Sequence, residues 1–300
     1  MAARATRSAS RKARVAEAVA TGPLGALGHD ELGVIFDGLA DPLQPVVAVA
    51  LSSTCLGLWA PLRAALGVLK ERHERAKALC RKLGDCHPGS CPSWVEMSCA
   101  GLAAAEVLSV PNRSLAVDDM ATLGMILRTN GLPRLRELRL FGNDLGDAGV
   151  QTLCEGLGRG LASLRSLVLG GTGFGPAGAA AVAAALRSGV MRRLEVLYLN
   201  HNPIDEQSAA ALAAALRKLP ALKMLNLDAC AIGDEDVASL VDNLGKDDFK
   251  ALESINLYGN KLTDAGRAKL AEAIDAGGLP NLRNCIGANQ ARDALERRRA

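Results

Sequence analysis

Five similar segments follow one another through the second half of the chain, and this repetition constrains the fold more than any other feature. The segments read LRELRLFGNDLGDAG, LRSLVLGGTGFGPAG, LEVLYLNHNPIDEQS, LKMLNLDACAIGDED and LESINLYGNKLTDAG. They begin at Leu135, Leu164, Leu194, Leu222 and Leu252, so successive starts are 28 to 30 residues apart. A fixed period of this length is typical of solenoids, in which each repeat is one supersecondary unit stacked on the next.

Each repeat changes its hydrophobic period partway along. Leu138 and Leu140 alternate as in a strand, whereas Leu153 and Leu157 are spaced as on one face of a helix. The pattern predicts a strand, a loop and a helix per repeat, stacked as a curved α/β solenoid with a parallel sheet inside and helices outside. A degenerate earlier unit fits the same frame, and a broken last unit starts near Leu282; the apolar residues of the earlier unit are Leu108, Val110, Leu115, Leu123 and Leu127.

A polar or small residue follows each predicted strand at the same position. A loop that turns inward leaves backbone N–H and C=O groups without partners, and a side-chain amide can satisfy both. We therefore assign a structural role to this column, called here the ladder, which consists of Asn143, Thr172, Asn202, Cys230 and Asn260.

Together these residues resemble the repeats of the ribonuclease-inhibitor type of leucine-rich-repeat protein. The repeat length, the helical second half and the alternation of Asn with another residue in the ladder all match that subclass. The resemblance implies a solenoid that binds another macromolecule and is not an enzyme. Fold alone does not identify the partner.

The side chains between the strand leucines should face away from the core, on the concave side of the sheet. This predicted partner-binding surface is called the sheet face. Exposed aromatic residues, Met and Arg are enriched at binding hot spots, so we expect a protein partner there. The predicted contact residues are Glu137, Arg139, Phe141, Val168, Val196, Tyr198, Asn200, Met224, Asn226, Asp228, Asn256 and Tyr258.

The N-terminal third shows a different pattern. Within residues 23–66, Asp30 can cap a helix, and a second apolar helix is expected to end near Pro61. The layout resembles an F-box, which docks a substrate receptor onto the Skp adaptor of cullin ubiquitin ligases. The resemblance implies adaptor binding through Leu32, Ile35 and Leu39. A helical cap that shields the first repeat is the alternative interpretation.

Three other patterns have simpler structural interpretations. Residues 173–178 spell G-x-G-x-x-G, but the repeat register explains these glycines, and Pro176 lacks an N–H for a phosphate. His201 is interpreted as a contact residue rather than a catalytic base, and no catalytic residue is expected. No metal or cofactor is expected either, because the spacing of one His/Cys cluster differs from paired zinc knuckles; it comprises Cys80, Cys86, His87, Cys91 and Cys99.

The domain prediction follows from these patterns. It comprises a basic disordered tail (1–22), the F-box-like segment or cap (23–66), a connecting helix with a Cys-containing loop (67–104), the leucine-rich-repeat domain (105–290) and a charged C-terminal tail (291–300). The net charge of +3 without a basic stripe argues against nucleic acid as partner, and no apolar stretch is long enough to span a bilayer. We expect a cytoplasmic or nuclear protein, with an organellar transit peptide in the basic tail as the alternative.

The predicted function is protein–protein interaction, specifically substrate recognition for a cullin-type ubiquitin ligase. One alternative is a regulator or GTPase-activating-type partner of a small GTPase, since the Ran GTPase-activating family is built on similar repeats. Another is a leucine-rich-repeat scaffold without a link to a ligase.

Overall fold

The computed structural model describes residues 40–46, 48, 49, 56–84, 97–129 and 132–299. Within these ranges one parallel sheet runs through the repeats, and each strand pairs with the strands that precede and follow it in the chain. Its strands are β1 (Val107–Ser109), β2 (Glu137–Arg139), β3 (Ser166–Val168), β4 (Val196–Tyr198), β5 (Met224–Asn226), β6 (Ser254–Asn256) and β7 (Asn284–Ile286).

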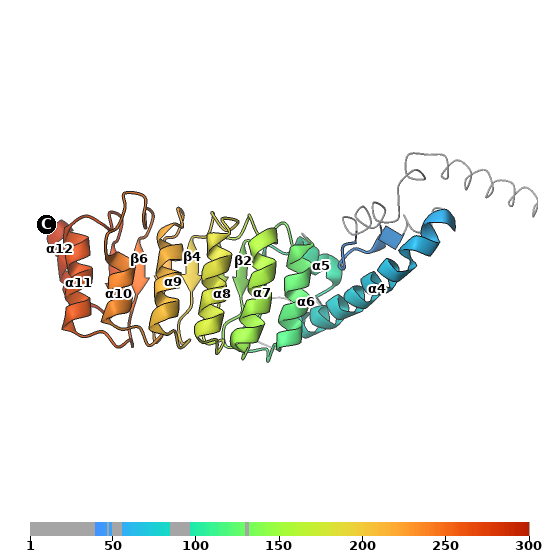
Figure 1. Ribbon diagram of the computed structural model, residues 1–300, viewed down its shortest axis with the longest axis horizontal. Coiled ribbons are helices and arrows are strands. Elements are labelled where there is room, and N and C mark those ends of the chain that lie inside the picture. Colours follow the sequence, from blue (N-terminus) through green and yellow to red (C-terminus); the bar gives the residue numbers. More distant parts are fainter. Residues whose placement is uncertain (1–39, 47, 50–55, 85–96, 130–131, 300) are drawn as a thin grey trace, which may run out of the picture.

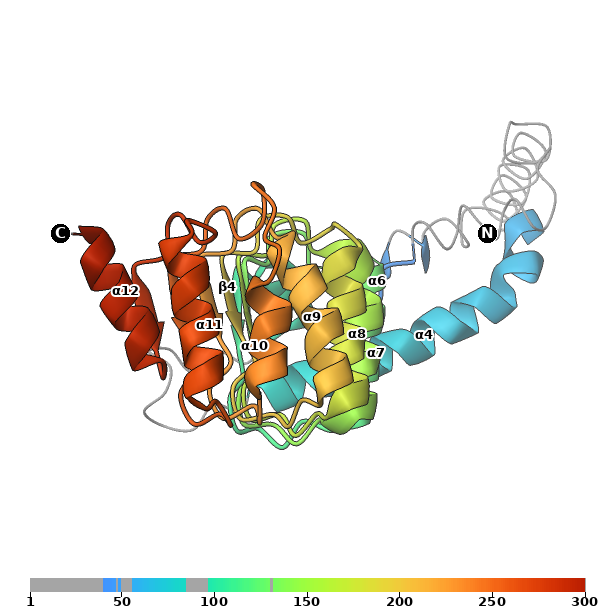
Figure 2. The ribbon, with the colours of Figure 1, turned by 60° about the vertical axis from the view of Figure 1, so that its left-hand side comes forward.

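One helix follows each strand, and the helices stand side by side over one face of the sheet (Figures 1 and 2). The other face carries no helix among the described residues. The predicted α/β leucine-rich-repeat solenoid is thus confirmed. The helices are α6 (Val117–Arg128), α7 (Gly146–Gly160), α8 (Pro176–Arg187), α9 (Glu206–Arg217), α10 (Asp234–Val241), α11 (Asp264–Asp275) and α12 (Asn289–Arg299).

Equivalent residues of neighbouring repeats are aligned across the sheet. Leu138 pairs with Leu167, which pairs with Leu197, and all three are buried. Burying one leucine side chain contributes about 1.5–3 kcal/mol, and each stacked leucine is buried by its counterparts in the adjacent repeats. The hydrophobic core is therefore continuous along the whole stack of repeats and is not a single central cluster.

Helices α6 and α7 approach each other more closely than side chains would allow. A Cβ atom at Gly156 would lie 2.5 Å from the carbonyl oxygen of Gly124, and one at Gly124 would lie 2.6 Å from that of Thr152. Real Cβ atoms do not come so close to backbone atoms, so both positions require glycine at this crossing.

The N-terminal helices α4 (Leu56–Gly84) and α5 (Cys99–Ala104) cover the first repeat. Leu79, Leu83 and Leu102 are buried in the same core as the strand leucines. The expected helix end near Pro61 is wrong, because α4 continues for more than twenty residues beyond it. The proline removes one hydrogen bond near the helix start, and packing of later turns against the first repeat stabilises the continuation. Leu32, Ile35 and Leu39 lie outside the described residues, as do residues 1–22.

The C-terminal boundary also differs from the sequence-based expectation. The broken last unit has both a strand, β7, and a helix, α12. Ala291, Ala294 and Leu295 of α12 are buried against the preceding repeat. The segment expected to form a charged tail is thus an amphipathic helix that extends the solenoid, because its few apolar residues share one face.

Candidate protein-interaction surface

The sheet face has the alignment that the repeats predicted. Glu137 pairs with Ser166, and the same column continues through Val196 and Met224 to Ser254. The neighbouring column runs from Arg139 through Val168, Tyr198 and Asn226 to Asn256. Both columns lie on the face that carries no described helix, between rows of buried strand leucines.

Large apolar side chains are exposed along this face. Phe141 is 39% exposed, Met224 40% and Tyr258 65%, while Val196 and Tyr198 are half-buried. The terminal strands β1 and β7 add Val107 and Ile286, at 49% and 44%. Exposed apolar side chains therefore occur from β1 to β7, interspersed with polar residues.

Asn200 departs from the prediction as a contact residue. Its side chain is only 8% exposed, because it lies over the position of a missing Cβ at Gly170, whose ideal Cβ would be 2.5 Å from the amide oxygen. The amide fills the space that a side chain at Gly170 would occupy. We therefore remove Asn200 from the candidate contact surface.

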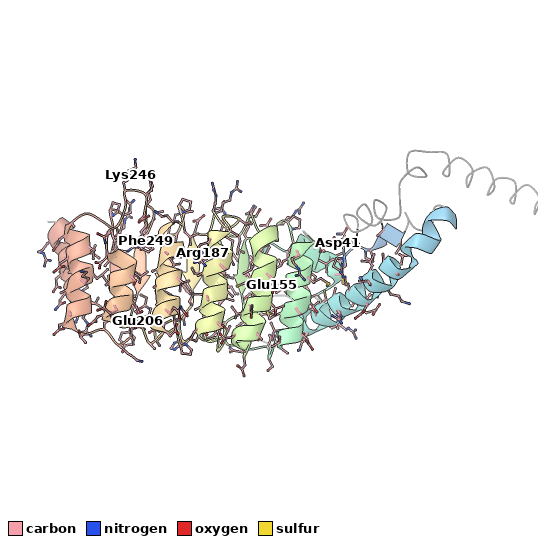
Figure 3. All side chains as sticks on the ribbon, viewed as in Figure 1. Asp41, Glu155, Arg187, Glu206, Lys246 and Phe249 are labelled. Carbon is pink, nitrogen blue, oxygen red and sulfur yellow. The ribbon has the colours of Figure 1, made fainter. Side chains whose placement is uncertain are left out.

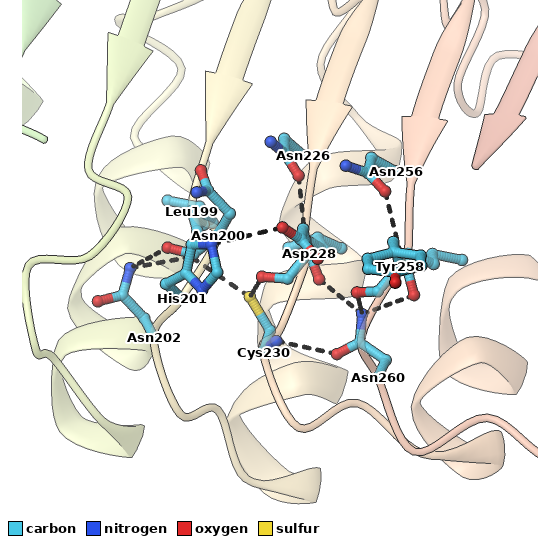
Figure 4. A network of polar contacts seen from close by, with 12 residues as sticks. Leu199, Asn200, His201, Asn202, Asn226, Asp228, Cys230, Asn256, Tyr258 and Asn260 are labelled. Carbon is cyan, nitrogen blue, oxygen red and sulfur yellow. Dashed lines mark hydrogen bonds and ion pairs between the residues drawn. The ribbon is translucent and has the colours of Figure 1, made fainter. Parts of the chain in front are cut away.

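The polar groups of the sheet face are partly engaged by one another (Figure 4). The amide oxygens of Asn226 and Asn256 accept hydrogen bonds from the backbone N–H groups of Asp228 and Tyr258, each at 3.0 Å. Their amide nitrogens donate to no residue in the described part of the chain, so two hydrogen-bond donors face outward. His201 Nε2 lies 3.5 Å from Asp228 Oδ2, and Arg139 forms an ion pair with Glu137.

The ladder residues connect consecutive repeats. The Asn143 amide oxygen accepts from the N–H groups of Arg113 and Leu115, and its nitrogen donates to the Val110 and Leu140 carbonyls. Asn260 makes all four equivalent bonds, and Asn202 makes three of them, with its oxygen accepting from Thr172 N–H alone. In the alternate repeats, the Thr172 hydroxyl donates to Leu169 O and the Cys230 thiol to Leu199 O. These side chains therefore hold the loops together and are not available to a partner.

Asn202→Ala is expected to lower the free energy of unfolding by about 1–3 kcal/mol, because buried backbone groups lose their partner. Thermal or chemical unfolding of the purified variant measures this change. Gln207→Ala is the matched control, since this amide is exposed on helix α9 and makes no side-chain hydrogen bond in the described part of the chain. An unfolding midpoint unchanged by Asn202→Ala contradicts the structural role of the ladder.

The loops at the helix N-termini form an acidic groove that the sequence analysis did not anticipate. This groove of about 670 Å³ contains Asp205, Glu206, Asp234, Glu235 and Asp236. Hydrogen bonds from Ser208 and from Thr263 lower the pKa values of Asp205 and Asp234, respectively. Figure 3 shows Glu206 on this rim and Lys246 on the opposite one. Acidic residues at helix N-termini offset the helix dipole, so the groove has a sufficient structural explanation.

The glycine-rich turn at 173–178 does not form an anion cradle. The N–H groups of Gly175 and Gly178 both donate to the Asp147 carboxylate of the preceding repeat, each at 2.7 Å. A phosphate would have to displace this carboxylate. The turn therefore connects two repeats.

The described residues contain no cluster of three or more metal-ligating side chains. Cys80 and Cys99 are free thiols whose sulfur atoms lie 3.7 Å apart, and burial raises the pKa of Cys80 to about 12. Cys86, His87 and Cys91 lie outside the described residues. Within the described part, no helix is long and apolar enough to cross a bilayer.

The stacked strand–helix units and the ladder define the fold class, an α/β leucine-rich-repeat solenoid. The family profile described as "Leucine Rich repeat" matches residues 132–154 and 160–183. The chain is similar to ribonuclease inhibitor of Sus scrofa, with 33% identity over 168 residues, which is 56% of this chain and 36% of that protein. Ribonuclease inhibitor of Mus musculus is 31% identical over 171 residues, again 56% and 36%.

Tonsoku-like protein of Bos taurus is 35% identical over 150 residues, or 49% of this chain and 11% of that protein. The matched region thus spans about a third of each ribonuclease inhibitor and a smaller part of the Tonsoku-like protein. The similarity supports the repeat architecture, which the relatives share over these regions.

Proposed function

We propose that the chain is a protein-interaction module without catalytic activity, and that it binds its partner through the sheet face. The presence of exposed Phe141, Met224 and Tyr258 on one face carries this proposal. Aromatic residues and Met are enriched at protein interfaces. The similarity to ribonuclease inhibitor, whose name describes a protein that acts on another protein, supports the same function class.

A photoreactive amino acid tests which face is used. We expect p-benzoylphenylalanine at position 258, on the sheet face, to cross-link one specific partner in cells. The same group at position 184, on the exposed side of helix α8, should give no cross-link to that protein. Cross-linking of the same partner only from position 184 would move the binding site to the helices.

A more specific proposal is that the partner is a substrate for a cullin-type ubiquitin ligase. Its support is the F-box-like sequence within residues 23–66, so it depends on a different part of the chain. The full-length chain should then co-purify with a Skp-type adaptor. Combined replacement of Leu32, Ile35 and Leu39 by aspartate should abolish this binding, because a docking helix would lose its apolar face.

The same aspartate variant keeps the sheet face unchanged, so its unfolding midpoint should equal that of the wild type. An equal midpoint shows that the loss of adaptor binding is not a loss of folding. Failure of the wild-type chain to bind the adaptor contradicts the ligase proposal and leaves the interaction module standing. Accelerated GTP hydrolysis by a small GTPase in the presence of the chain would instead support the alternative function, a regulator or GTPase-activating-type partner of a small GTPase.

A further inference from the structure

The last repeat is shorter than the others at the point where its strand ends. Helix α11 begins eight residues after the end of β6, at Asp264, whereas α12 begins at Asn289, three residues after the end of β7. Gly287 makes this sharp turn with a φ of +87°, and a Cβ there would lie 2.4 Å from the backbone nitrogen of Tyr258. Each earlier loop between a strand and its helix is covered by the equivalent loop of the next repeat. The loop between β6 and α11 lacks this cover in the described part of the chain.

The backbone N–H group of Gly259 loses its usual partner as a result. In each earlier loop, the residue equivalent to Gly259 donates to a carbonyl of the next repeat; these bonds are Asn112 to Phe141, Gly142 to Gly170, Gly171 to Asn200, His201 to Asp228 and Ala229 to Tyr258. The residues equivalent to Leu262 differ in this respect: Leu115 and Ile232 donate to a ladder amide, Leu145 and Ile204 donate to a ladder backbone carbonyl, and Phe174 N–H has no acceptor in the described part of the chain. No residue in the described part of the chain accepts from the N–H groups of Gly259 or Leu262.

Both residues line a pocket of about 530 Å³ between the last two repeats, here called the terminal pocket. The side chains of Asn284, Asn289, Arg267 and Arg292 also line it. Arg267 forms an ion pair with the exposed Asp264 at 3.1 Å. Arg292 has no ion pair with any residue that the structure describes, and the described lining includes no aspartate or glutamate.

This arrangement of donors determines the chemistry of a suitable ligand. Backbone N–H groups and guanidinium groups are donors, and charge-assisted hydrogen bonds to a carboxylate are stronger than neutral ones. One repeat earlier, the planar amide of Asn260 provides one oxygen that accepts from Cys230 N–H and Ile232 N–H, whose counterparts at the pocket are the N–H groups of Asn260 and Leu262. A carboxylate has the same planar shape and adds the charge that Arg292 would pair with.

The terminal pocket adjoins the sheet face. Tyr258 and Ile286, both exposed there, also line the pocket. We propose that the terminal pocket binds an acidic side chain, through its carboxylate, of the protein that docks on the sheet face. The identity of the ligand as part of that partner rests on the function proposed above, whereas the preference for a carboxylate rests on the pocket alone.

A titration of the isotopically labelled full chain tests the preference, with backbone amide resonances as the readout. The probes are blocked glutamate (N-acetyl-glutamate N-methylamide), its neutral glutamine counterpart and inorganic phosphate. Blocked glutamate should shift the Gly259 and Leu262 resonances in a saturable manner, and the glutamine compound should not. Arg292→Gln should weaken this binding at least tenfold. Arg297→Gln, on the same helix but paired with Asp275, is the matched control and should leave it unchanged.

Equal shifts with blocked glutamate and glutamine, or no effect of Arg292→Gln, overturn the carboxylate site. Saturation by phosphate without saturation by blocked glutamate overturns it in favour of a phosphate site. Once a partner is known, Arg292→Gln should also weaken that complex at least tenfold. If the wild-type chain binds blocked glutamate but the Arg292→Gln variant keeps full affinity for the partner, the pocket does not bind a side chain of that partner, and this part of the proposal is overturned. Partner cross-links from position 258 without binding of blocked glutamate leave the interaction module in place and remove only the pocket.

Discussion

Replacing Phe141, Tyr198 and Tyr258 together by alanine is expected to weaken partner binding by about 4 kcal/mol or more, since single hot-spot truncations cost about 2 kcal/mol or more. A loss of about 4 kcal/mol corresponds to roughly a 1,000-fold rise in Kd. The chain has four Phe, two Tyr and two Trp, and three of these eight lie on the sheet face. Their loss removes most of the aromatic surface that a partner could bury.

The thermal stability of the triple variant should remain close to that of the wild type, because these side chains lie outside the buried core. Calorimetric titration with the cross-linked partner measures the affinity, and a thermal melt measures the stability. Alanine replacement of Gln151, Gln207 and Glu272, which are exposed on helices α7, α9 and α11, is the matched control. Full affinity in the triple aromatic variant means that the partner binds elsewhere.

Gly156→Leu is expected to destabilise the fold by about 3 kcal/mol or more, at the upper end of the usual cost of overpacking. The new Cβ would meet backbone atoms of Gly124 at 2.5–2.9 Å. Backbone cannot rotate away as a side chain can, so helices α6 and α7 would have to separate. Separation would expose the apolar residues between the first two repeats.

Chemical denaturation of the purified variant measures the loss. Gly67→Ala is the matched control, since Gly67 also lies in a helix but its Cβ would meet open space. That variant should be slightly more stable, by about 0.5–1 kcal/mol, because alanine favours helix over glycine. A Gly156→Leu variant as stable as the wild type would contradict the tight crossing.

The sequence predicted the repeating parts of the fold because the same physical requirement recurs in every repeat. Leu138, Leu167 and Leu197 stack on one another, so a single register determines which residues face the core and which form the sheet face. The hydrogen bonds of Asn143 follow from the same register.

Features that break the repeat were less predictable. The burial of Asn200 depends on the absence of a side chain at Gly170, in the turn after β3, thirty residues earlier. The terminal pocket depends on Gly287, which replaces a loop by a sharp turn. The sequence signal was present in both cases, since a glycine stands where other repeats have a side chain. Its consequence depends on contacts between repeats, which periodicity does not describe.

The alignment of every strand with only its two sequence neighbours has a consequence for how the molecule unfolds. Residues far apart in the chain do not touch across a common centre, so stability is approximately the sum of terms for each repeat and each junction. Such a chain behaves as a one-dimensional array, in which an end repeat can detach while the others stay folded. A repeat that is destabilised would therefore unfold together with its own junctions, while more distant repeats keep their structure.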